Sequence, residues 1–472
     1  MRIWSYTLML TLTTTVARWL GAVVLALLAV PRAPALAQEA TLTLRQALEL
    51  SATSGVANRT ARAALDGASA GQLATWRGFL PSLRVDAGFT RTTDPVGAFG
   101  TTLRQQRITQ DDFDPARLNF PASIDNFTGA VVLEQPLVVL DAWLAARASA
   151  RSREGAAFAA DWTAMTTQVQ VVEAWYGVVL AAERATTMTA AVRAAEAHAR
   201  DAELMLEAGL VTRSDALLAA ARAGELEGVR LEAVRDSVLA GRQLAVLLGA
   251  GAAELPDIRA TFPADGAVER MAQNVLALDV QSRADIEGAR SASDATAADV
   301  ARARATMVPR IVSFARRDLN SRQHPFEGAS NWTVGVMASW SLFNGASELA
   351  DRRGAASRRA ASQAQLAGAE ALAAVDLERT ALTVRTALSR LAISRRTVEQ
   401  AREAHRIVGR KYAGGLATVG ELLDAAAAEM QARLTLAAAR HSLITSLAER
   451  LRAIGHEPAR LAVLDEPAPA SP

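Results

Sequence analysis

The chain has 472 residues, of which 50% are hydrophobic and only 5% aromatic, so small aliphatic side chains supply most of its apolar surface. Such a composition suits long helices packed side by side better than one thick globular core. The formal net charge of +2 gives no reason to expect a nucleic-acid partner. The sequence contains no cysteine, which excludes disulfide bonds and a lipid anchor attached through cysteine.

Residues 1–37 are predicted to be a secretory signal peptide. Basic residues Arg2 and Arg18 precede an apolar run over 19–30, and Ala35-Leu36-Ala37 forms a small-x-small cleavage signal. The run of about 12 residues is too short for a membrane-spanning helix, which needs about 20. Cleavage would remove three arginines and no acid, which changes the formal charge from +2 to −1.

The rest of the chain contains two copies of one plan. Residues 209–217, GLVTRSDAL, resemble residues 415–423, GLATVGELL, and residues 79–83, FLPSL, resemble residues 307–311, MVPRI. A repeat of about 200 residues indicates a duplication and not a short solenoid unit. We therefore expect a first structural repeat over 38–248, a linker or equatorial segment over 249–267, a second repeat over 268–455 and a C-terminal tail over 456–472.

Each copy is expected to contain a helical segment, two strands, a very long helix and a further helix. The helical segments cover 44–79 and 268–306, the long helices 142–206 and 346–412, and the further helices 214–248 and 419–454. No proline occurs over 137–255 or over 326–457, and these spans are rich in alanine, leucine, arginine and glutamate. A helix of about 65 residues is roughly 100 Å long, which fits a coiled-coil tube or stalk better than a compact domain.

Four segments alternate apolar and polar residues as strands do: 83–90, 127–135, 311–317 and 332–342. Transmembrane barrel strands need about 9–11 residues with one lipid-facing side. For any single segment of this kind an ordinary half-buried hairpin is the better explanation. Four such segments, paired twice beside very long helices in an exported chain, favour membrane strands instead. On the last strand the expected lipid-facing residues are Trp332, Val334, Val336, Trp340 and Leu342.

The sequence offers no constellation for enzyme chemistry. The five histidines lie far apart in the sequence and no two have metal-ligand spacing; they are His198, His324, His405, His441 and His456. There is also no glycine loop of the phosphate-binding kind. We therefore expect a protein that is not an enzyme and that needs no cofactor or metal.

Several motifs together resemble the outer-membrane efflux protein family, also called TolC-like. They are LTLRQAL at 42–48, FLPSL at 79–83, WSLFNG at 340–345 and the two Gly-Leu turns at 209 and 415. Their order, duplication and spacing make the resemblance specific, and it extends over residues 42–455. It implies an α+β membrane protein, in which a trimeric 12-stranded β-barrel with four strands per chain continues into a long periplasmic α-helical coiled-coil barrel. Residues 250–266 and the tail from residue 458 would form an irregular belt around this cylinder.

The resemblance implies a function as well as a fold. The chain would be a passive outer-membrane exit duct of a tripartite efflux system, exporting small molecules from the periplasm or from an inner-membrane pump. Its partners would be two further copies of itself, a periplasmic adaptor (membrane fusion) protein, an inner-membrane transporter and outer-membrane lipid. It would lie in the outer membrane with a large periplasmic portion. Independently, four strands alone cannot close a barrel, and an open sheet edge is not tolerated in lipid.

Two alternatives stay open on the sequence. The same passive tube could serve as a type I protein-secretion conduit, because nothing in the sequence selects the cargo. A non-channel exported coiled-coil structural protein fits less well, since such a protein does not need four amphipathic strands between its helices. The long loop over 92–123 is expected to face outside the cell, and the sequence assigns it no role.

The two Gly-Leu turns would form the periplasmic tips. The resemblance implies that these residues contact the adaptor: Gly209, Leu210, Thr212, Gly415, Leu416 and Thr418. Capping boxes explain one acid in each turn, because Thr212 can cap with Asp215 and Thr418 with Glu421.

The resemblance also suggests a gate at the tips. Glu421 and Asp424 share one helix face, which would line the narrow periplasmic entrance in three copies and attract cations. It further suggests that Tyr412 ties across to Asp215 and holds the entrance shut.

Overall fold

The computed structural model describes residues 42–250, 258 and 260–465, and the predicted signal peptide lies outside them. The chain divides into two compact units, one of residues 1–42 and 256–259 and one of residues 43–255 and 260–472. The first unit is described only at Leu42 and Ile258. All elements named below belong to the second unit.

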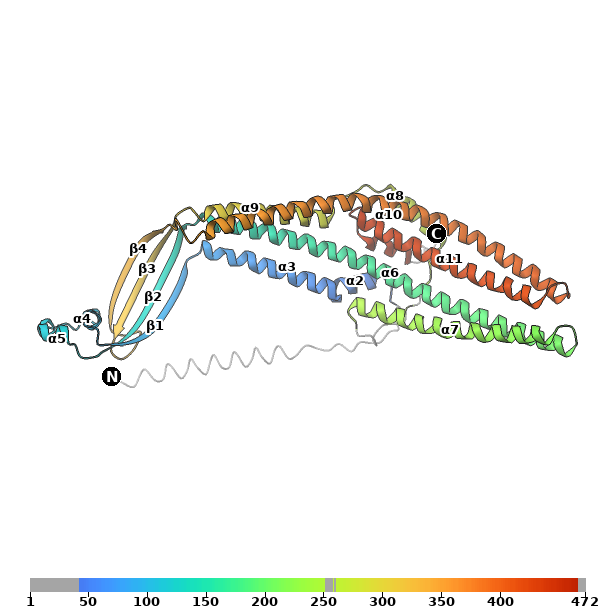
Figure 1. The fold of residues 1–472 in the computed structure, drawn as a ribbon, viewed down its shortest axis with the longest axis horizontal. Helices are drawn as coiled ribbons and strands as arrows, with labels where there is room; N and C mark the ends of the chain where they lie inside the picture. The colour runs from blue at the N-terminus through green and yellow to red at the C-terminus, as the bar shows by residue number, and fades with distance from the viewer. Residues whose placement is uncertain (1–41, 251–257, 259, 466–472) are drawn as a thin grey trace, which may run out of the picture. The chain divides into compact units, whose positions relative to one another are not determined.

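Most of this unit is helical (Figure 1). The principal helices are α2 (Leu44–Ser54), α3 (Val56–Ala74), α6 (Leu140–Glu207), α7 (Arg213–Leu248), α8 (Asp265–Ala277), α9 (Ala284–Ala305), α10 (Ser347–Ala413) and α11 (Val419–Ala453). Short helical segments are η1 (Thr75–Gly78), α4 (Pro95–Arg104), η2 (Gln110–Phe113), α5 (Pro115–Asn119) and η3 (Pro458–Asp465).

Two very long helices organise the unit, as the sequence predicts. Helix α6 has 68 residues and α10 has 67, so each is about 100 Å long. Helix α6 packs against α3, α7, α9 and α11, while α10 packs against α9 and α11. Many of the buried contact residues are alanines, which let the helix axes approach closely. The largest fully buried side chains include several on α6, α7 and α11: Trp175, Tyr176, Leu244, Leu248, Leu443, Ile444, Leu447 and Leu451.

The first helical segment is broken, whereas the sequence predicted one helix over 44–79. Gly55 separates α2 from α3 with a ψ of 133°, outside the helical range. Asn58 stabilises the break, because its Nδ2 donates a 2.9 Å hydrogen bond to the carbonyl of Ser51, which also accepts from the Gly55 N–H. The second half of the predicted helix ends at Ala74, followed by the short segment η1.

The corresponding segment of the second copy is also broken, although one helix over 268–306 was predicted. Residues 278–283 separate α8 from α9 and bind the end of α11. The Gln281 N–H donates to the carbonyl of Ile454 at 2.8 Å, and His456 Nε2 lies 3.0 Å from the carbonyl of Asp279. Helix α8 begins at Asp265, inside the stretch expected to be irregular.

The expected belt is only partly visible. Residues 260–264 are irregular, but 251–257 and 259 lie outside the described residues. The tail from Pro458 is not irregular at first, because it forms η3 and only then leaves the described part of the chain.

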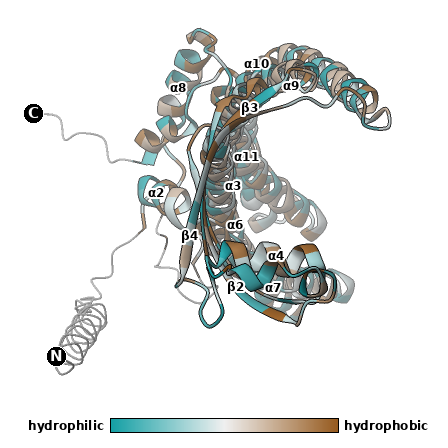
Figure 2. Cartoon of the chain, turned by 90° about the vertical axis from the view of Figure 1, so that its left-hand side faces the viewer, coloured by the Kyte–Doolittle hydropathy of each residue, from teal (hydrophilic) through white to brown (hydrophobic). Residues whose placement is uncertain are grey.

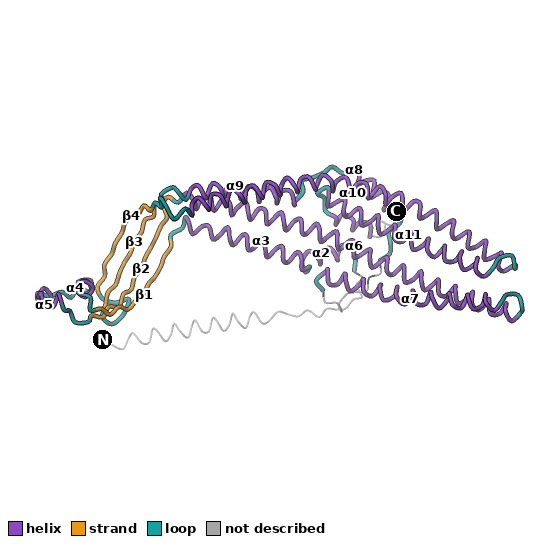
Figure 3. The backbone as a smooth tube through the Cα atoms, viewed as in Figure 1, coloured by secondary structure: helices purple, strands orange, loops and turns teal. Residues whose placement is uncertain are grey.

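One four-stranded antiparallel sheet is inserted between the helices (Figure 3). Its strands are β1 (Ser82–Thr92), β2 (Ile124–Val138), β3 (Arg310–Ser321) and β4 (Ala329–Ser339), in the order β1-β2-β3-β4. All four were predicted, and three of them extend beyond their predicted ends. The register is regular except for a bulge near Pro136, where a missing N–H interrupts the ladder.

The excursion between β1 and β2, residues 93–123, carries its own short helices, α4, η2 and α5. Asp94 caps α4 by accepting a 2.6 Å bond from the Gly97 N–H, and Asp114 caps α5 by accepting one of 2.9 Å from the Ala116 N–H. Two aspartates of this loop are therefore helix caps. The segment leaves the sheet at the ends of the strands that lie away from the long helices.

Candidate functional site: the helical tips, the cavity above them and the sheet

The two tips are built by the same turn. Gly209 and Gly415 have φ angles of +75° and +71°, a left-handed conformation that favours glycine. The residue after each glycine closes the turn, with Leu210 N–H donating to the Met205 carbonyl and Leu416 N–H to the Lys411 carbonyl, both at 2.8 Å. This geometry leaves both leucine side chains pointing into open space, 74% and 80% exposed. The tips therefore present apolar side chains that are free to contact a partner.

Both predicted capping boxes are present. The Thr212 and Thr418 N–H groups donate to Asp215 and Glu421 at 3.0 and 2.8 Å, and each threonine Oγ1 accepts from the N–H of the same acid. Hydrogen bonds from the side chain and backbone of Thr212 hold the pKa of Asp215 below its usual range. Hydrogen bonds from the backbone and side chain of Thr418 do the same for the pKa of Glu421. Both carboxylates are thus ionised caps.

A small apolar core joins the two tips. We call it the tip core; it consists of Ala202, Ala216, Ala219, Tyr412, Val419, Leu422 and Leu423. Tyr412 is only 8% exposed, and its hydroxyl has no hydrogen-bond partner among the described residues. Burial, followed by the charges of Asp201 and Asp215, raises the pKa of Tyr412. The chain thus brings Tyr412 into the field of Asp215 but forms no hydrogen bond between them, because the Asp215 carboxylate binds Thr212.

The remaining predicted gate residue, Asp424, lies one turn beyond Glu421 on α11, and both are exposed. The two acids come close together on one helix surface, as their spacing of three requires.

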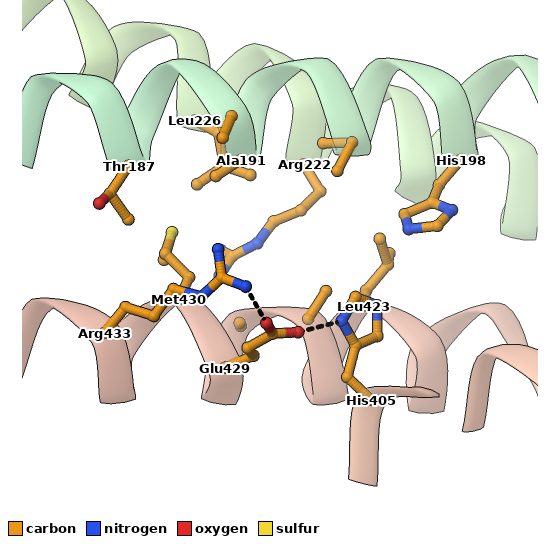
Figure 4. Close-up of a pocket in the computed structure, with 15 residues that line it drawn as sticks. Thr187, Ala191, His198, Arg222, Leu226, His405, Leu423, Glu429, Met430 and Arg433 are labelled. Carbon is orange, nitrogen blue, oxygen red and sulfur yellow. Dashed lines mark hydrogen bonds and ion pairs between the residues drawn. The ribbon is translucent and has the colours of Figure 1, made fainter. Parts of the chain in front are cut away.

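A cavity of about 240 Å³ lies between the two helical hairpins, further from the tips than the tip core. Figure 4 shows its walls: α6 and α7 on one side, α10 and α11 on the other. Most of the lining is apolar, including Leu226, Leu423 and Met430. The polar part is a cluster at one side, where Glu429 lies between His405 and Arg433 and binds both (Figure 4).

The cavity brings together two histidines from different hairpins. His198 on α6 and His405 on α10 have ring centroids 6.3 Å apart in an edge-on contact. Burial, and then the charge of His405, lowers the pKa of His198. Burial acts to raise the pKa of Glu429, but the hydrogen bond from His405 and the charge of Arg433 outweigh it and lower that pKa.

Sequence reasoning missed this pair because it looked for histidines close in sequence. A usable signal existed: His198 lies 11 residues before Gly209 and His405 lies 10 residues before Gly415. Similar positions in two equivalent hairpins meet when the hairpins pack together. In the described part of the chain, no group of three or more histidines, cysteines or acids could hold a metal ion.

The sheet has two chemically different faces. Residues that lie opposite each other on antiparallel strands share a face of the sheet, so the register shows on which of the two faces each side chain lies. The apolar face carries Leu83, Val85, Phe89, Phe127, Val131, Leu133, Ile311, Leu319, Trp332, Val334 and Val336. The polar face carries Arg84, Asp86, Thr90, Asn126, Thr128, Glu134, Arg316, Asp318, Asn320, Asn331 and Thr333.

Ion pairs run along the polar face, with Arg84 close to Asp86 and Arg316 close to Asp318. The apolar face is largely uncovered in the single chain; Trp332, Val334 and Val336 are 77%, 62% and 66% exposed. Charged residues interrupt this face at Arg317, directly opposite Trp332, and at the ion pair of Arg91 with Asp125. Figure 2 colours the same strands by hydropathy and shows both classes of residue along them.

Three of the five predicted lipid-facing residues lie on the apolar face of β4, but Trp340 and Leu342 do not, because β4 ends at Ser339. Ser339 pairs with Arg310, the first residue of β3, and Pro309 before it has no N–H to continue the ladder. Trp340 instead donates from Nε1 to the carbonyl of Met307 at 2.7 Å. That bond fastens the return from the sheet to the helices.

No helix in the described residues has a stretch long and apolar enough to span a bilayer.

Comparison with known proteins gives a family match over part of the chain and a fold. Residues 276–456 match the outer membrane efflux protein family. The structure is similar to VceC, an outer membrane protein of Vibrio cholerae, with a TM-score of 0.71 and 20% identity over 88% of this chain and 96% of VceC. No curated protein matches this chain.

Two outer membrane channels have the same fold. The CmeC channel of Campylobacter jejuni is similar with a TM-score of 0.72 and 13% identity, over 88% of this chain and 86% of CmeC. The MtrE channel of Neisseria gonorrhoeae, in its open state, gives a TM-score of 0.68 and 16% identity, over 88% of this chain and 89% of MtrE.

These findings confirm the predicted resemblance and the mostly helical α+β fold with a four-stranded sheet. CmeC and MtrE are outer membrane channels, and this chain is similar to them in fold.

Proposed function

Because this chain matches the outer membrane efflux proteins over residues 276–456 and shares the fold of outer-membrane channels, we propose that it is an outer-membrane exit duct for efflux. Three copies would form one channel, and small molecules would pass through it from the periplasm, or from an inner-membrane pump, to the outside.

The observation that carries this proposal is the incomplete, two-faced sheet. Within the described chain, β1 and β4 are edge strands, each with 11 residues and one unpaired side. An apolar outer face beside an open edge is stable in lipid only if another copy closes it. The strands alternate in direction, so β4 of one copy would pair antiparallel with β1 of the next. Three copies of four strands then give a closed barrel of 12 strands with a polar interior.

The helices suggest how such a barrel would reach its partners. Helices α6 and α10 continue for about 100 Å away from the sheet, the scale needed to extend deep into the periplasm. Their far ends carry the exposed leucines Leu210 and Leu416, flanked by rigid capped turns. We propose these tips as the contact for a periplasmic adaptor, which would couple the duct to an inner-membrane transporter.

The entrance would lie at the same tips. Three copies of Glu421 and Asp424 would form acidic rings that attract cations and disfavour anions. Closure would involve the Tyr412 hydroxyl, which is buried and has no hydrogen-bond partner among the described residues of one chain. It could bind an acid once the copies assemble.

The proposal is tested by location, assembly and conductance together. The protein should stay with outer membranes after salt and carbonate washing, have the mass of a trimer in detergent, and form channels in planar bilayers. A chain released by carbonate, or a stable membrane-inserted monomer, would show the proposal to be wrong. A trimeric protein that stays with the membranes after washing but never conducts would restrict the proposal to a structural role.

A further inference from the structure

The side chain of Gln105 joins the excursion between β1 and β2 to the interior of the sheet. Gln105 ends helix α4 and is 6% exposed. Its Nε2 donates two 2.9 Å hydrogen bonds, one to the Asn126 side-chain oxygen and one to the Asp125 carbonyl. Arg107, which follows shortly, returns its N–H to the Thr102 carbonyl and tightens the same turn.

The bonds continue across the sheet. Asn126 Nδ2 donates to Asn320 Oδ1 at 3.0 Å, and these two residues are only 4% and 3% exposed. The result is a buried chain of three neutral amides from α4 through β2 to β3. Buried amides are costly to leave unpaired, so such a chain fixes position more strongly than exposed contacts would.

The register decides which side of the sheet α4 is fastened to. Asn126 lies one position before Phe127, which is on the apolar face, and Asn320 lies opposite Thr128 on the polar face. Both amides therefore belong to the polar face, near the end of the sheet away from the long helices. Figure 2 shows α4 beside β2 at that end.

We propose that residues 93–123 lie over the polar side of the barrel and form an outer constriction of the channel, with Gln105 as the residue that positions it. This inference rests on the proposed function, because the polar face is the channel interior only in an assembled barrel. The excursion exposes large apolar side chains, with Val96 and Phe120 at 81% and 86%. Three copies would surround the exit with such groups, and apolar constrictions restrict passage by size and by dewetting.

The chain provides an unusual background for a test, since it contains no cysteine. Thr333→Cys places one thiol on the polar face of β4, and Val334→Cys places a control thiol on the apolar face beside it. Intact cells are then treated from outside with a small maleimide or with a large polyethylene-glycol maleimide. Because the reagents enter from outside, the periplasmic entrance does not affect the result.

Two matched substitutions isolate the Gln105 bonds. Gln105→Glu keeps the shape but replaces the donor with a carboxylate facing two oxygen acceptors, whereas Gln106→Glu makes the same change at the exposed neighbour. A third variant replaces residues 95–119 with a short glycine-serine linker and shows the access that remains without the constriction.

With an intact excursion the small reagent should label T333C and the large reagent should label it slowly. Gln105→Glu should speed labelling by the large reagent about tenfold, the effect expected from losing such hydrogen bonds, and Gln106→Glu should not. Equal rates for the two glutamate variants, or full access of the large reagent before any change, would overturn the constriction. If Gln105→Glu does not assemble, the shortened variant decides in the same way. Failure of even the small reagent to label T333C in the shortened variant would contradict the proposed channel itself.

Discussion

A charge placed on β4 tests which face of the sheet meets the membrane. Val334 is the sixth of the 11 residues of β4 and lies on the apolar face, while Met337 lies on the opposite face nearer the helices. In the single chain the two side chains are almost equally exposed, at 62% and 57%. Folding of one chain in water would therefore tolerate arginine equally at both positions, and only a membrane distinguishes them.

The expected free-energy cost of each arginine depends on its depth in the bilayer. Arginine facing lipid costs about 2–4 kcal/mol at the middle of the bilayer and about 0–1 kcal/mol near the interfaces. Val334→Arg places three such charges in one trimer, for a total of roughly 6–12 kcal/mol. Val336→Arg lies two residues, or about 7 Å of strand, closer to the helices and should cost less. Met337→Arg should cost little, because its charge faces water inside the barrel.

The measurement is the amount of folded trimer in washed outer membranes, together with the temperature at which the trimer dissociates. Both should fall most for Val334→Arg, less for Val336→Arg and least for Met337→Arg. Equal yields for all three variants, or the reverse order, would show that the apolar face does not meet lipid.

Two further predictions concern the helical end. Tyr412→Phe removes a buried hydroxyl for which the described residues offer no hydrogen-bond partner, so it should not destabilise one chain. It should raise channel conductance if that hydroxyl closes the entrance, and unchanged conductance in bilayers would contradict this role. The lowered pKa of His198 means that the folded chain binds its proton less readily than the unfolded chain, whose histidine titrates near 6.5. Stability near the cavity should therefore fall as the pH drops below about 6.5. Hydrogen exchange along α6 measures this stability, and His198→Gln should make it less dependent on pH. An equal pH response in the wild-type protein and the variant would exclude His198 as the source of the dependence.

The long helices and tips were predictable because local signals determine them. Continuous proline-free, alanine-rich sequence specifies α6 and α10, and each Gly-Leu turn is specified by a glycine followed by a threonine cap. The strands were predictable for the same reason, because apolar and polar residues alternate along every strand of a sheet whose two faces have different environments.

The failures have tertiary causes. The break between α8 and α9 is bonded to residues just after α11: the Gln281 N–H donates to the Ile454 carbonyl, and the Asp279 carbonyl lies within hydrogen-bond distance of the His456 ring. A window of local sequence does not contain these partners. The end of β4 was misjudged because alternation continued to Leu342, whereas its partner strand has no residue with which to pair Trp340. The contact between His198 and His405 depends on how two helical hairpins pack together. The sequence shows only that each histidine lies at a similar distance from the glycine of its own turn.

The capping boxes leave one question about the tips that this chain can answer itself. Glu421 is both a helix cap and a candidate entrance charge, and removal of the whole side chain would confuse the two roles. At the start of α2 the same box is made with glutamine: the Thr43 N–H donates to Gln46 Oε1 at 3.0 Å, and Thr43 Oγ1 accepts from the Gln46 N–H.

Glu421→Gln should therefore keep the cap and remove only the charge. We expect an unchanged dissociation temperature for the trimer and a reduced cation preference in planar bilayers, with Asp215→Asn in the other tip as a comparison. Because Thr418 lowers the pKa of Glu421, the wild-type carboxylate stays ionised as the pH falls toward its usual value of 4.5, so the difference between the two proteins should persist in mildly acidic solution. Identical selectivity with an intact trimer would mean that Glu421 is a cap alone and that any acidic ring at the entrance depends on Asp424.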